Sequence, residues 1–493
     1  MKALSVLVAF LVLVSVVCTA APAEHLIQEL PGLRNASSVS FRQYAGYVTI
    51  DAAHNKRLFY WFVESQRRPA EDPLVLWMNG GPGSSSLVGF LTEHGPFRPT
   101  RDGALEPYAQ AWNRVANVLY VEAPAGVGFS RSDDPSDYTT DDQKTAADNY
   151  VFLEQWFALF PEYRQHALYL SGESYAGHYI PTLAREILVR DTAKRLNVAG
   201  LLIGDPATHQ DWFLPSMPGA DAWPYMGFLY HHGLISQAAY ESAFLSCKFG
   251  AYMADCSANF SSKSPACRAA LAAAIKEVPA TLDVYNVDAD VCIRPHGSAN
   301  GAAADAFQHT AQWSGLSRHL AQQRLRLVQQ QQQQQQQQPV EYEQDHRVDP
   351  CLASYMPAYL NRADVQRALH VEPTVWKEFG GIHYGTMDDD MVPVYQEILN
   401  HPRTGAWRIL IFSGDFDLCV PFEATQRWVR CLGRPVVRPW HAWTLASGQV
   451  GGSIVEYDRI AFLTVKGSGH MVPYYTPDKG FAFFQRWIDK QSF

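Results

Sequence analysis

Several features that define whole classes of protein are scarce or missing in this sequence. Of its 493 residues only 18% are charged, and 40 Lys and Arg stand against 49 Asp and Glu, so the net charge of −9 is small for the length. No basic cluster marks one segment, which argues against nucleic acid as a partner. No Cys-x-x-Cys pair or His-Glu-x-x-His segment is present. The sequence therefore predicts neither a metal site nor a cofactor.

Long apolar runs are also rare, and the clearest one lies at the N-terminus. Lys2 precedes an apolar stretch over residues 3–17, and small residues follow at 18–23. The stretch is short for a membrane span and ends as a cleaved secretory signal does, so we predict a signal peptide over residues 1–20. An N-terminal membrane anchor is the alternative. With the signal removed, we expect a soluble protein of the secretory route without membrane association.

Cysteine usage fits that route. Eight cysteines are present, and Cys18 falls within the predicted signal, which leaves seven. An oxidising compartment would pair most of them, but the odd number leaves at least one free or bonded to another chain. Asn35 and Asn259 each begin an Asn-x-Ser sequence, which accepts glycans in the same compartment.

What the sequence does contain points to a large α/β protein. Hydrophobic residues make up 47% of the chain and aromatic residues 13%, which excludes a disordered or fibrous protein. The length fits one large domain with an insertion as well as it fits two domains. Alternating strands and helices predict a mostly parallel sheet flanked by helices. We expect strands over 44–50, 58–63, 73–78, 117–122, 166–171, 406–413 and 459–465, and helices over 142–160, 175–188 and 479–490.

The alternation breaks in the middle of the chain. We expect a core made of residues 21–211 and 351–493, interrupted by a helical insertion, or lid, over 212–293 that holds four cysteines. Residues 294–350 are polar and include an unbroken run of glutamines at 329–338. Such a tract buries little apolar surface and predicts a disordered loop.

A serine lies where a predicted strand passes into a helix. Gly172-Glu173-Ser174-Tyr175-Ala176 has the pattern of a nucleophile elbow, a tight turn that raises a serine hydroxyl above the edge of a sheet. An ordinary helix-capping serine is the alternative. The placement between an apolar strand and an amphipathic helix favours Ser174 as a nucleophile.

A serine nucleophile needs a base and a group that orients the base. Asp415 and Asp417 follow the predicted strand 406–413, and we assign the orienting role to Asp417 and a turn-holding role to Asp415. His470 lies in a glycine-rich turn after the predicted strand 459–465 and is the expected base. His178, one helical turn beyond Ser174, is the rival, but side chains on that helix are expected to point away from the substrate.

A tetrahedral oxyanion also requires preorganised N–H donors. One is the backbone of Tyr175, which follows the nucleophile. The other is expected in the glycine turn after the strand 73–78, at Gly80 or Gly81. A glycine turn can instead bind phosphate, but no Lys-Ser or Lys-Thr follows at the required spacing.

Five segments resemble those of the serine carboxypeptidase family, which includes cathepsin A, the yeast vacuolar enzyme and the plant enzymes. The likeness extends over residues 41–490, and the five segments, in the family's order, are 77–83, 121–130, 172–177, 413–421 and 467–473. The resemblance implies an α/β-hydrolase fold that releases single C-terminal residues from peptides and proteins at acidic pH through an acyl-enzyme. It implies the same triad of Ser174, Asp417 and His470, with oxyanion donors at Gly81 and Tyr175.

The resemblance further implies a site for the substrate's terminal carboxylate. The residues that match it are Asn79, Gly80, Glu93 and Glu173, and Met471 matches a residue that lines the pocket for the departing side chain. Two adjacent carboxyls do not both ionise readily, so one stays protonated and donates to the incoming carboxylate. We therefore expect peptidase activity to fall as the pH rises toward neutrality.

Some positions depart from the family pattern. Ser84 stands where many members have a cysteine bonded to the equivalent of Cys351, which predicts Cys351 as the unpaired thiol. Asp205 replaces a common asparagine. Some relatives are activated by excision within the inserted region, for which the glutamine tract is the natural candidate here. The pairings that the likeness implies are Cys247–Cys256 and Cys267–Cys292, and the remaining possibility is Cys419–Cys431.

Other functions are compatible with the same fold. Some relatives are acyltransferases that use the serine to move an acyl group to an alcohol, and several of these carry Asp before the nucleophile where this chain has Glu173. A protective partner of other enzymes is a second alternative, and a general esterase is a third. A homodimer is compatible with all of them.

Overall fold

The computed structural model describes residues 21–208, 222–250, 256, 264–279, 281–292, 349–385 and 390–493. The predicted signal peptide, the sequence at Asn259 and most of the expected polar loop lie outside these ranges. Within them, no helix combines the length and apolarity needed to cross a bilayer. Asn35 is exposed in the left-handed region of backbone space, with φ of 50°.

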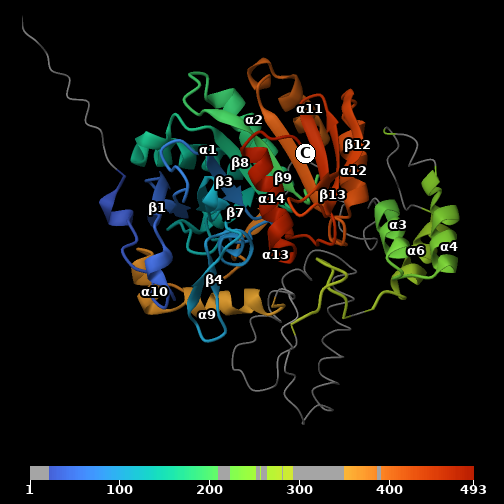
Figure 1. Ribbon diagram of the computed structural model, residues 1–493, viewed down its shortest axis with the longest axis horizontal. Coiled ribbons are helices and arrows are strands. Elements are labelled where there is room, and N and C mark those ends of the chain that lie inside the picture. The colour runs from blue at the N-terminus through green and yellow to red at the C-terminus, as the bar shows by residue number, and fades with distance from the viewer. Residues whose placement is uncertain are drawn as a thin grey trace, which may run out of the picture.

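A ten-stranded sheet forms the centre of the molecule, in the order β1-β2-β6-β3-β8-β9-β11-β14-β13-β12 (Figure 1). Its inner strands run parallel to one another and its outer pairs are antiparallel, which confirms the predicted mostly parallel sheet. The inner strands are β6 (Asn117–Val121), β3 (Leu74–Met78), β8 (Leu168–Glu173), β9 (Val198–Gly204), β11 (Arg408–Gly414) and β14 (Ile460–Val465). The outer ones are β1 (Gln43–Asp51), β2 (Lys56–Val63), β13 (Val450–Tyr457) and β12 (Val436–Thr444).

Each face of the sheet supports its own apolar core. Successive side chains of a strand point to opposite faces, and in β11 Ile409 and Ile411 enter one core while Leu410 and Phe412 enter the other. The first core is covered by α1 (Asp142–Leu159), α2 (Ala176–Arg190), α11 (Val392–Asn400) and α12 (Phe422–Cys431). The second is covered by α14 (Pro477–Ile488), α9 (Met356–Leu360) and α10 (Ala363–Ala368).

The predicted helices are present, with ends that differ by one or two residues from those expected. The Asp141 side chain caps α1 by accepting a hydrogen bond from the Lys144 N–H at 2.8 Å, and Pro161 follows its last turn. Helix α2 starts directly after Tyr175 and buries Ile180, Leu183 and Ile187 against the sheet. The remaining short elements are the pairs β4 (Phe97–Pro99) with β5 (Leu105–Pro107) and β7 (Thr139–Asp141) with β10 (His383–Gly385).

The inserted region contains a small helical unit. Helices α3 (Ala222–His231), α4 (Gln237–Cys247) and α6 (Pro265–Ile275) gather to one side of the sheet (Figure 1). They enclose a third apolar core that includes Phe228 and Leu271, and Leu418 from the main core region packs into it. The insertion is therefore attached to the chain just beyond β11.

The structure corrects the disulfide pairings implied by the family likeness. The bonds join Cys247 to Cys267, Cys256 to Cys431 and Cys292 to Cys351, and Cys419 is buried and free. The predicted pairs Cys247–Cys256, Cys267–Cys292 and Cys419–Cys431 are therefore wrong, as is the prediction that Cys351 is unpaired. The cause is the packing of α4 against α6, which brings the end of one helix to the start of the other and sets Cys247 and Cys267 4.7 Å apart between Cα atoms.

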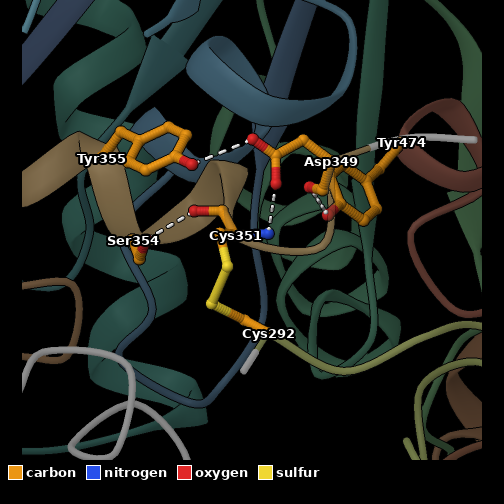
Figure 2. The surroundings of a disulfide bond; sticks show 6 residues. All are labelled: Cys292, Asp349, Cys351, Ser354, Tyr355 and Tyr474. Carbon is orange, nitrogen blue, oxygen red and sulfur yellow. Dashed lines mark hydrogen bonds between the residues drawn. A yellow bond between two sulfur atoms is a disulfide. The ribbon is translucent and has the colours of Figure 1, made fainter. Parts of the chain in front are cut away.

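The Cys292–Cys351 bond lies next to Asp349, where the chain rejoins the core (Figure 2). Asp349 accepts hydrogen bonds from the Cys351 N–H at 2.8 Å and the Tyr355 hydroxyl at 3.0 Å. Its carbonyl accepts one from the Tyr474 hydroxyl at 2.9 Å. These contacts fix the Cys351 end of the bond, and the bond itself ties Cys292 to it across a separation of 59 positions.

A cut within the glutamine tract tests the pairings. We would replace residues 329–338 with the recognition site of a specific endoprotease. Because Cys256–Cys431 and Cys292–Cys351 both connect the parts before and after the cut, the cleaved protein should migrate as one species without reductant and as two with it. Cys351→Ser or Cys431→Ser alone should leave the parts joined, and the double variant should separate them. Separation of the cleaved wild type without reductant would support the pairings implied by likeness.

Candidate active site

Ser174 lies at the tip of a tight turn between β8 and α2, as predicted. Its φ of 62° places it in the left-handed region, which a non-glycine residue adopts only when its surroundings hold it there. Its N–H donates to the Gly204 carbonyl at 3.0 Å, and its own carbonyl accepts from Gly177 and Ala207 at 2.9 and 3.0 Å. The turn is therefore held on both sides.

Small residues around the elbow allow this close packing. A Cβ on Gly172 would lie 2.3 Å from the Met78 carbonyl oxygen and 2.6 Å from the Ala176 Cβ. One on Gly177 would lie 2.1 Å from the Ala207 carbonyl oxygen. These glycines thus allow α2 to pack closely against the end of the sheet.

The predicted base and its orienting group are paired. The Nδ1 atom of His470 lies 2.7 Å from Oδ2 of Asp417, and both side chains are buried. The other carboxylate oxygen of Asp417 accepts from the Cys419 N–H at 2.7 Å. A hydrogen bond from Nδ1–H to the carboxylate leaves Nε2 as the basic nitrogen, which is the arrangement a serine hydrolase requires.

Asp415, to which we assign a turn-holding role, bonds to the loop after β14. Its Oδ1 accepts hydrogen bonds from the N–H groups of Gly467 at 2.6 Å and Ser468 at 3.3 Å. The Phe416 N–H donates to the Ser468 carbonyl at 2.7 Å. The loop after β11 and the loop after β14 are therefore tied to each other.

The insertion contributes a contact that the sequence gives no signal for. The His470 N–H donates to the Tyr285 carbonyl at 2.7 Å, and the two rings lie 5.2 Å apart. Neighbouring backbone bonds join Leu418 to Val284 at 3.1 Å and Val287 to Phe416 at 3.0 Å. Residues near Tyr285 thus form part of the wall around His470, although no motif marks them.

The glycine turn after β3 lies directly against the elbow. A Cβ on Gly80 would be 2.3 Å from the Tyr175 nitrogen and 2.8 Å from the Glu173 carbonyl oxygen, so glycine alone fits there. Gly81 has φ of 111°, also in the region that favours glycine. This contact places the turn that carries Gly81 against the elbow that carries Tyr175, the two expected oxyanion donors.

Asn79 joins the two glutamates that the resemblance singles out. Its Nδ2 donates to Oε1 of Glu173 at 2.9 Å and to Oε1 of Glu93 at 3.1 Å. Its own side-chain oxygen is held by the Trp77 indole N–H at 2.7 Å and the Gly89 N–H at 3.1 Å. The amide is thereby fixed in the orientation that serves both carboxyls.

The two glutamates cannot both be ionised at low cost. Both are buried, and each has an Oε2 atom without a hydrogen-bond partner among the described residues. Burial and the neighbouring charge of Glu93 raise the pKa of Glu173 well above its usual range, and burial also raises the pKa of Glu93. A single proton shared by the two carboxyls removes one buried negative charge and supplies a hydrogen bond between them.

The base and the carboxyl pair are electrostatically close. The charge of His470 acts on the pKa of Glu93, and that of Asp417 acts on the pKa of Glu173, the residue before the nucleophile. Since β8, β9, β11 and β14 are parallel neighbours, the loops that follow them meet at one edge of the sheet. The structure therefore gathers Ser174, Asp417 and His470 at this edge together with the carboxyl pair.

His178, the rival base, occupies a different environment. It is fully buried under the elbow, its ring stacks 4.5 Å from that of Tyr175, and its Nδ1 lies 3.5 Å from Asp142. Asp142 also accepts a hydrogen bond from the Tyr175 hydroxyl at 3.1 Å. These contacts give His178 a role in supporting the elbow from below.

Met471, which follows His470, is half-buried at the start of α13 (Val472–Tyr475).

Among the described residues, one group has metal-ligand proximity: Asp417, Cys419 and His470, with ligand atoms within 4.8 Å of one another. The carboxylate and imidazole already bond to each other. Burial, with the charges of Asp417 and Asp205, raises the pKa of the Cys419 thiol well above its usual value, so the thiolate that would bind a metal is disfavoured. The group is better suited to proton transfer than to holding a metal.

Comparison with known proteins gives a consistent assignment. Residues 31–490 match the family model described as serine carboxypeptidase. The chain is 34% identical to serine carboxypeptidase 1 of Hordeum vulgare, with 95% of this chain and 93% of that protein aligned. It is 32% identical to serine carboxypeptidase-like 20 of Arabidopsis thaliana, with 98% and 97% aligned.

A solved structure supports the fold. A prohormone-processing carboxypeptidase of Saccharomyces cerevisiae superposes with a TM-score of 0.66 at 21% identity, covering 95% of each chain. That similarity, with the mixed sheet and its flanking helices, identifies the α/β-hydrolase fold. The full-length match and the curated relatives place the chain, on sequence, in the serine carboxypeptidase family.

Proposed function

We propose that this protein is a serine carboxypeptidase that releases single residues from the C-termini of peptides in acidic conditions. The observation that carries the proposal is the buried pair of Glu93 and Glu173, joined by Asn79 and adjacent to Ser174. A protonated carboxyl and a fixed amide at this place suit the recognition of a carboxylate. A general esterase would have no use for such a pair.

The reaction would proceed through an acyl-enzyme. Ser174 Oγ attacks the carbonyl carbon of the last peptide bond while its proton passes to Nε2 of His470, and Asp417 stabilises the imidazolium that forms. The N–H groups of Tyr175 and Gly81 would hold the oxyanion. The C–N bond breaks as His470 returns the proton to the leaving amine. A water then attacks the ester by the same route and frees Ser174.

The position of the carboxyl pair would restrict the enzyme to chain ends. The terminal carboxylate binds to Asn79, the Gly80 N–H and the glutamate pair, and Met471 contacts the departing side chain. Because the bound carboxylate belongs to the residue after the scissile bond, one residue leaves at a time. An amidated C-terminus carries no charge to match this site.

Glu173 favours peptidase action over acyl transfer to an alcohol. It stands directly before the nucleophile and is one of the two carboxyls bonded to Asn79. The three disulfides are consistent with folding in an oxidising compartment, and we propose the secretory route with a secreted, lysosomal or vacuolar destination.

The proposed activity is tested with a pair of substrates at about pH 5, where a shared-proton carboxyl pair works. Purified protein is given an N-blocked dipeptide with a free C-terminus and the same dipeptide as its amide. The free acid should be cleaved at least about a hundredfold faster in kcat/KM, as expected when a buried polar site is left unpaired. Ser174→Ala should abolish release. Equal cleavage of both substrates would indicate a general esterase or amidase, and no cleavage by a folded protein would favour acyl transfer or a protective role.

The glutamate pair predicts a particular dependence on pH. The raised pKa of Glu173 keeps it protonated in acid, and the proton is lost as the pH rises through that value. KM for the free acid should therefore increase between pH 5 and 8, and Glu173→Gln should flatten this increase because the amide donor does not ionise. Glu423→Gln is a matched control, since burial raises the pKa of Glu423 to about 7 at the start of α12, outside the pair. An unchanged wild-type KM across this range would contradict the role of the pair.

A further inference from the structure

A third buried carboxyl lies between the nucleophile and the acid loop. Asp205 follows β9 directly, and β9 is the strand that separates β8 from β11. Its N–H donates to the Phe412 carbonyl at 2.8 Å, and its φ is 41°. The preceding carbonyl, that of Gly204, accepts the hydrogen bond from the Ser174 N–H. Asp205 therefore belongs to the framework that connects the two halves of the site.

Only one oxygen of this carboxyl has a conventional partner. Oδ1 accepts a hydrogen bond from the Gly414 N–H at 3.0 Å, at the end of β11. Oδ2 is buried and has no hydrogen-bond donor near it in the part of the chain that the structure describes. The residue itself is fully buried. An ionised carboxylate with one bare oxygen in such a place is costly, so the arrangement points to a protonated Oδ2 that is itself a donor.

Among the described residues, the charged groups that act on the pKa of Asp205 are carboxyls, which can accept a proton, and no cation is among them. Burial and then the charge of Asp417 raise the pKa of Asp205 well above its usual range, and the charge of Glu173 adds to the effect. The other titratable neighbour is Cys419, a protonated thiol. Glu173 comes from the end of β8, and Asp417 and Cys419 come from the loop after β11. Among these groups, Asp417 is the carboxylate that His470 needs in its ionised form.

We propose that Asp205 is a positioning residue that remains protonated and donates its Oδ2 proton to the Asp417 carboxylate. The Asp205 proton would give Asp417 a third hydrogen bond, beside those that it receives from the His470 ring and the Cys419 N–H. Asp205 touches no substrate and acts through Asp417 alone. The inference rests on the proposed function, because it assigns a purpose to Asp417 only if Ser174 and His470 act as nucleophile and base.

Loss of the Asp205 proton would disturb the site from within. Two ionised carboxylates in contact repel each other strongly in a buried environment, and Asp417 would be displaced from His470. The base would lose its orientation even while the substrate-binding glutamates are unaffected. Asp205 thus places a second, separate upper limit on the pH at which Ser174 can be activated.

The test measures the reactivity of Ser174 without using the carboxylate site. An alkyl phosphonofluoridate forms a bond from serine oxygen to phosphorus and releases fluoride, and it carries no C-terminal carboxylate. We would follow its rate of reaction with Ser174 from pH 5 to 9 in the wild type, Asp205→Ala and Asp205→Asn. Asp102→Asn, an exposed aspartate paired with Arg34, serves as the matched surface control.

Asp205→Ala should react about tenfold to a hundredfold more slowly, the effect of losing one hydrogen bond to a charged group. Asp205→Asn should restore most of this loss, since its amide is a donor of the same shape. It should also keep its reactivity at the alkaline end, where the wild type declines. Full reactivity of the Ala variant, equal impairment of both variants, or identical alkaline profiles of wild type and Asn variant would each overturn the inference.

A second measurement covers the case in which the Ala variant does not fold. The infrared difference spectrum of wild type minus Asp205→Asn should show the carbonyl stretch of a protonated carboxylic acid at neutral pH, and its absence would overturn the inference. If wild-type Ser174 fails to react at any pH, the proposed function itself fails, and this result is distinct from a changed pH profile. If Ser174 reacts normally and the substitutions of Asp205 have no effect, only the positioning role of Asp205 is disproved.

Discussion

The pairing of β9 with β8 on one side and β11 on the other is the contact on which the site depends. It sets the elbow that holds Ser174 beside the loop that holds Asp417, and Phe412 pairs with Gly204 at the junction. Through β14 the same sheet brings His470 to that edge. None of these side chains would be near the others without the parallel register. The relative positions of Ser174, Asp417 and His470 are thus set by the order and register of the strands that precede them.

The folded chain also buries several acidic groups, with consequences for stability. Glu173, Asp205 and Glu122 are buried, and their pKa values are raised, in the case of Glu122 to about 7. A carboxyl with a raised pKa binds its proton more tightly in the folded than in the unfolded chain. Its contribution to stability is complete below the unfolded pKa of about 4 and is lost as the pH rises through the folded value. Acid therefore suits the fold as well as the proposed chemistry.

Much of this arrangement could be predicted from sequence because it is encoded locally. The elbow around Ser174 and the aspartates after a buried strand each have a short pattern, and the strands carrying them are continuous apolar runs. What sequence could not supply is what depends on distant packing. The Cys247–Cys267 bond follows the contact of α4 with α6, the Tyr285 contact to His470 comes from an unmarked segment, and β9, β12 and β13 are not among the predicted strands. The lack of a hydrogen-bond donor at Oδ2 of Asp205 likewise depends on the packing of β9 against β11 and has no signal in the sequence.

The order of the strands along the chain also governs when the protein can become active. Strands β9 and β11 are neighbours in the sheet, yet β9 ends at residue 204 and β11 begins at residue 408, so residues 205–407 must be made between them. Closing a loop of that length is entropically unfavourable until the contacts at its ends form. A chain still emerging from the ribosome holds its serine without its base. On the proposed function, hydrolytic capacity therefore arises only after His470 has been made, and a product that stops before this residue is inert.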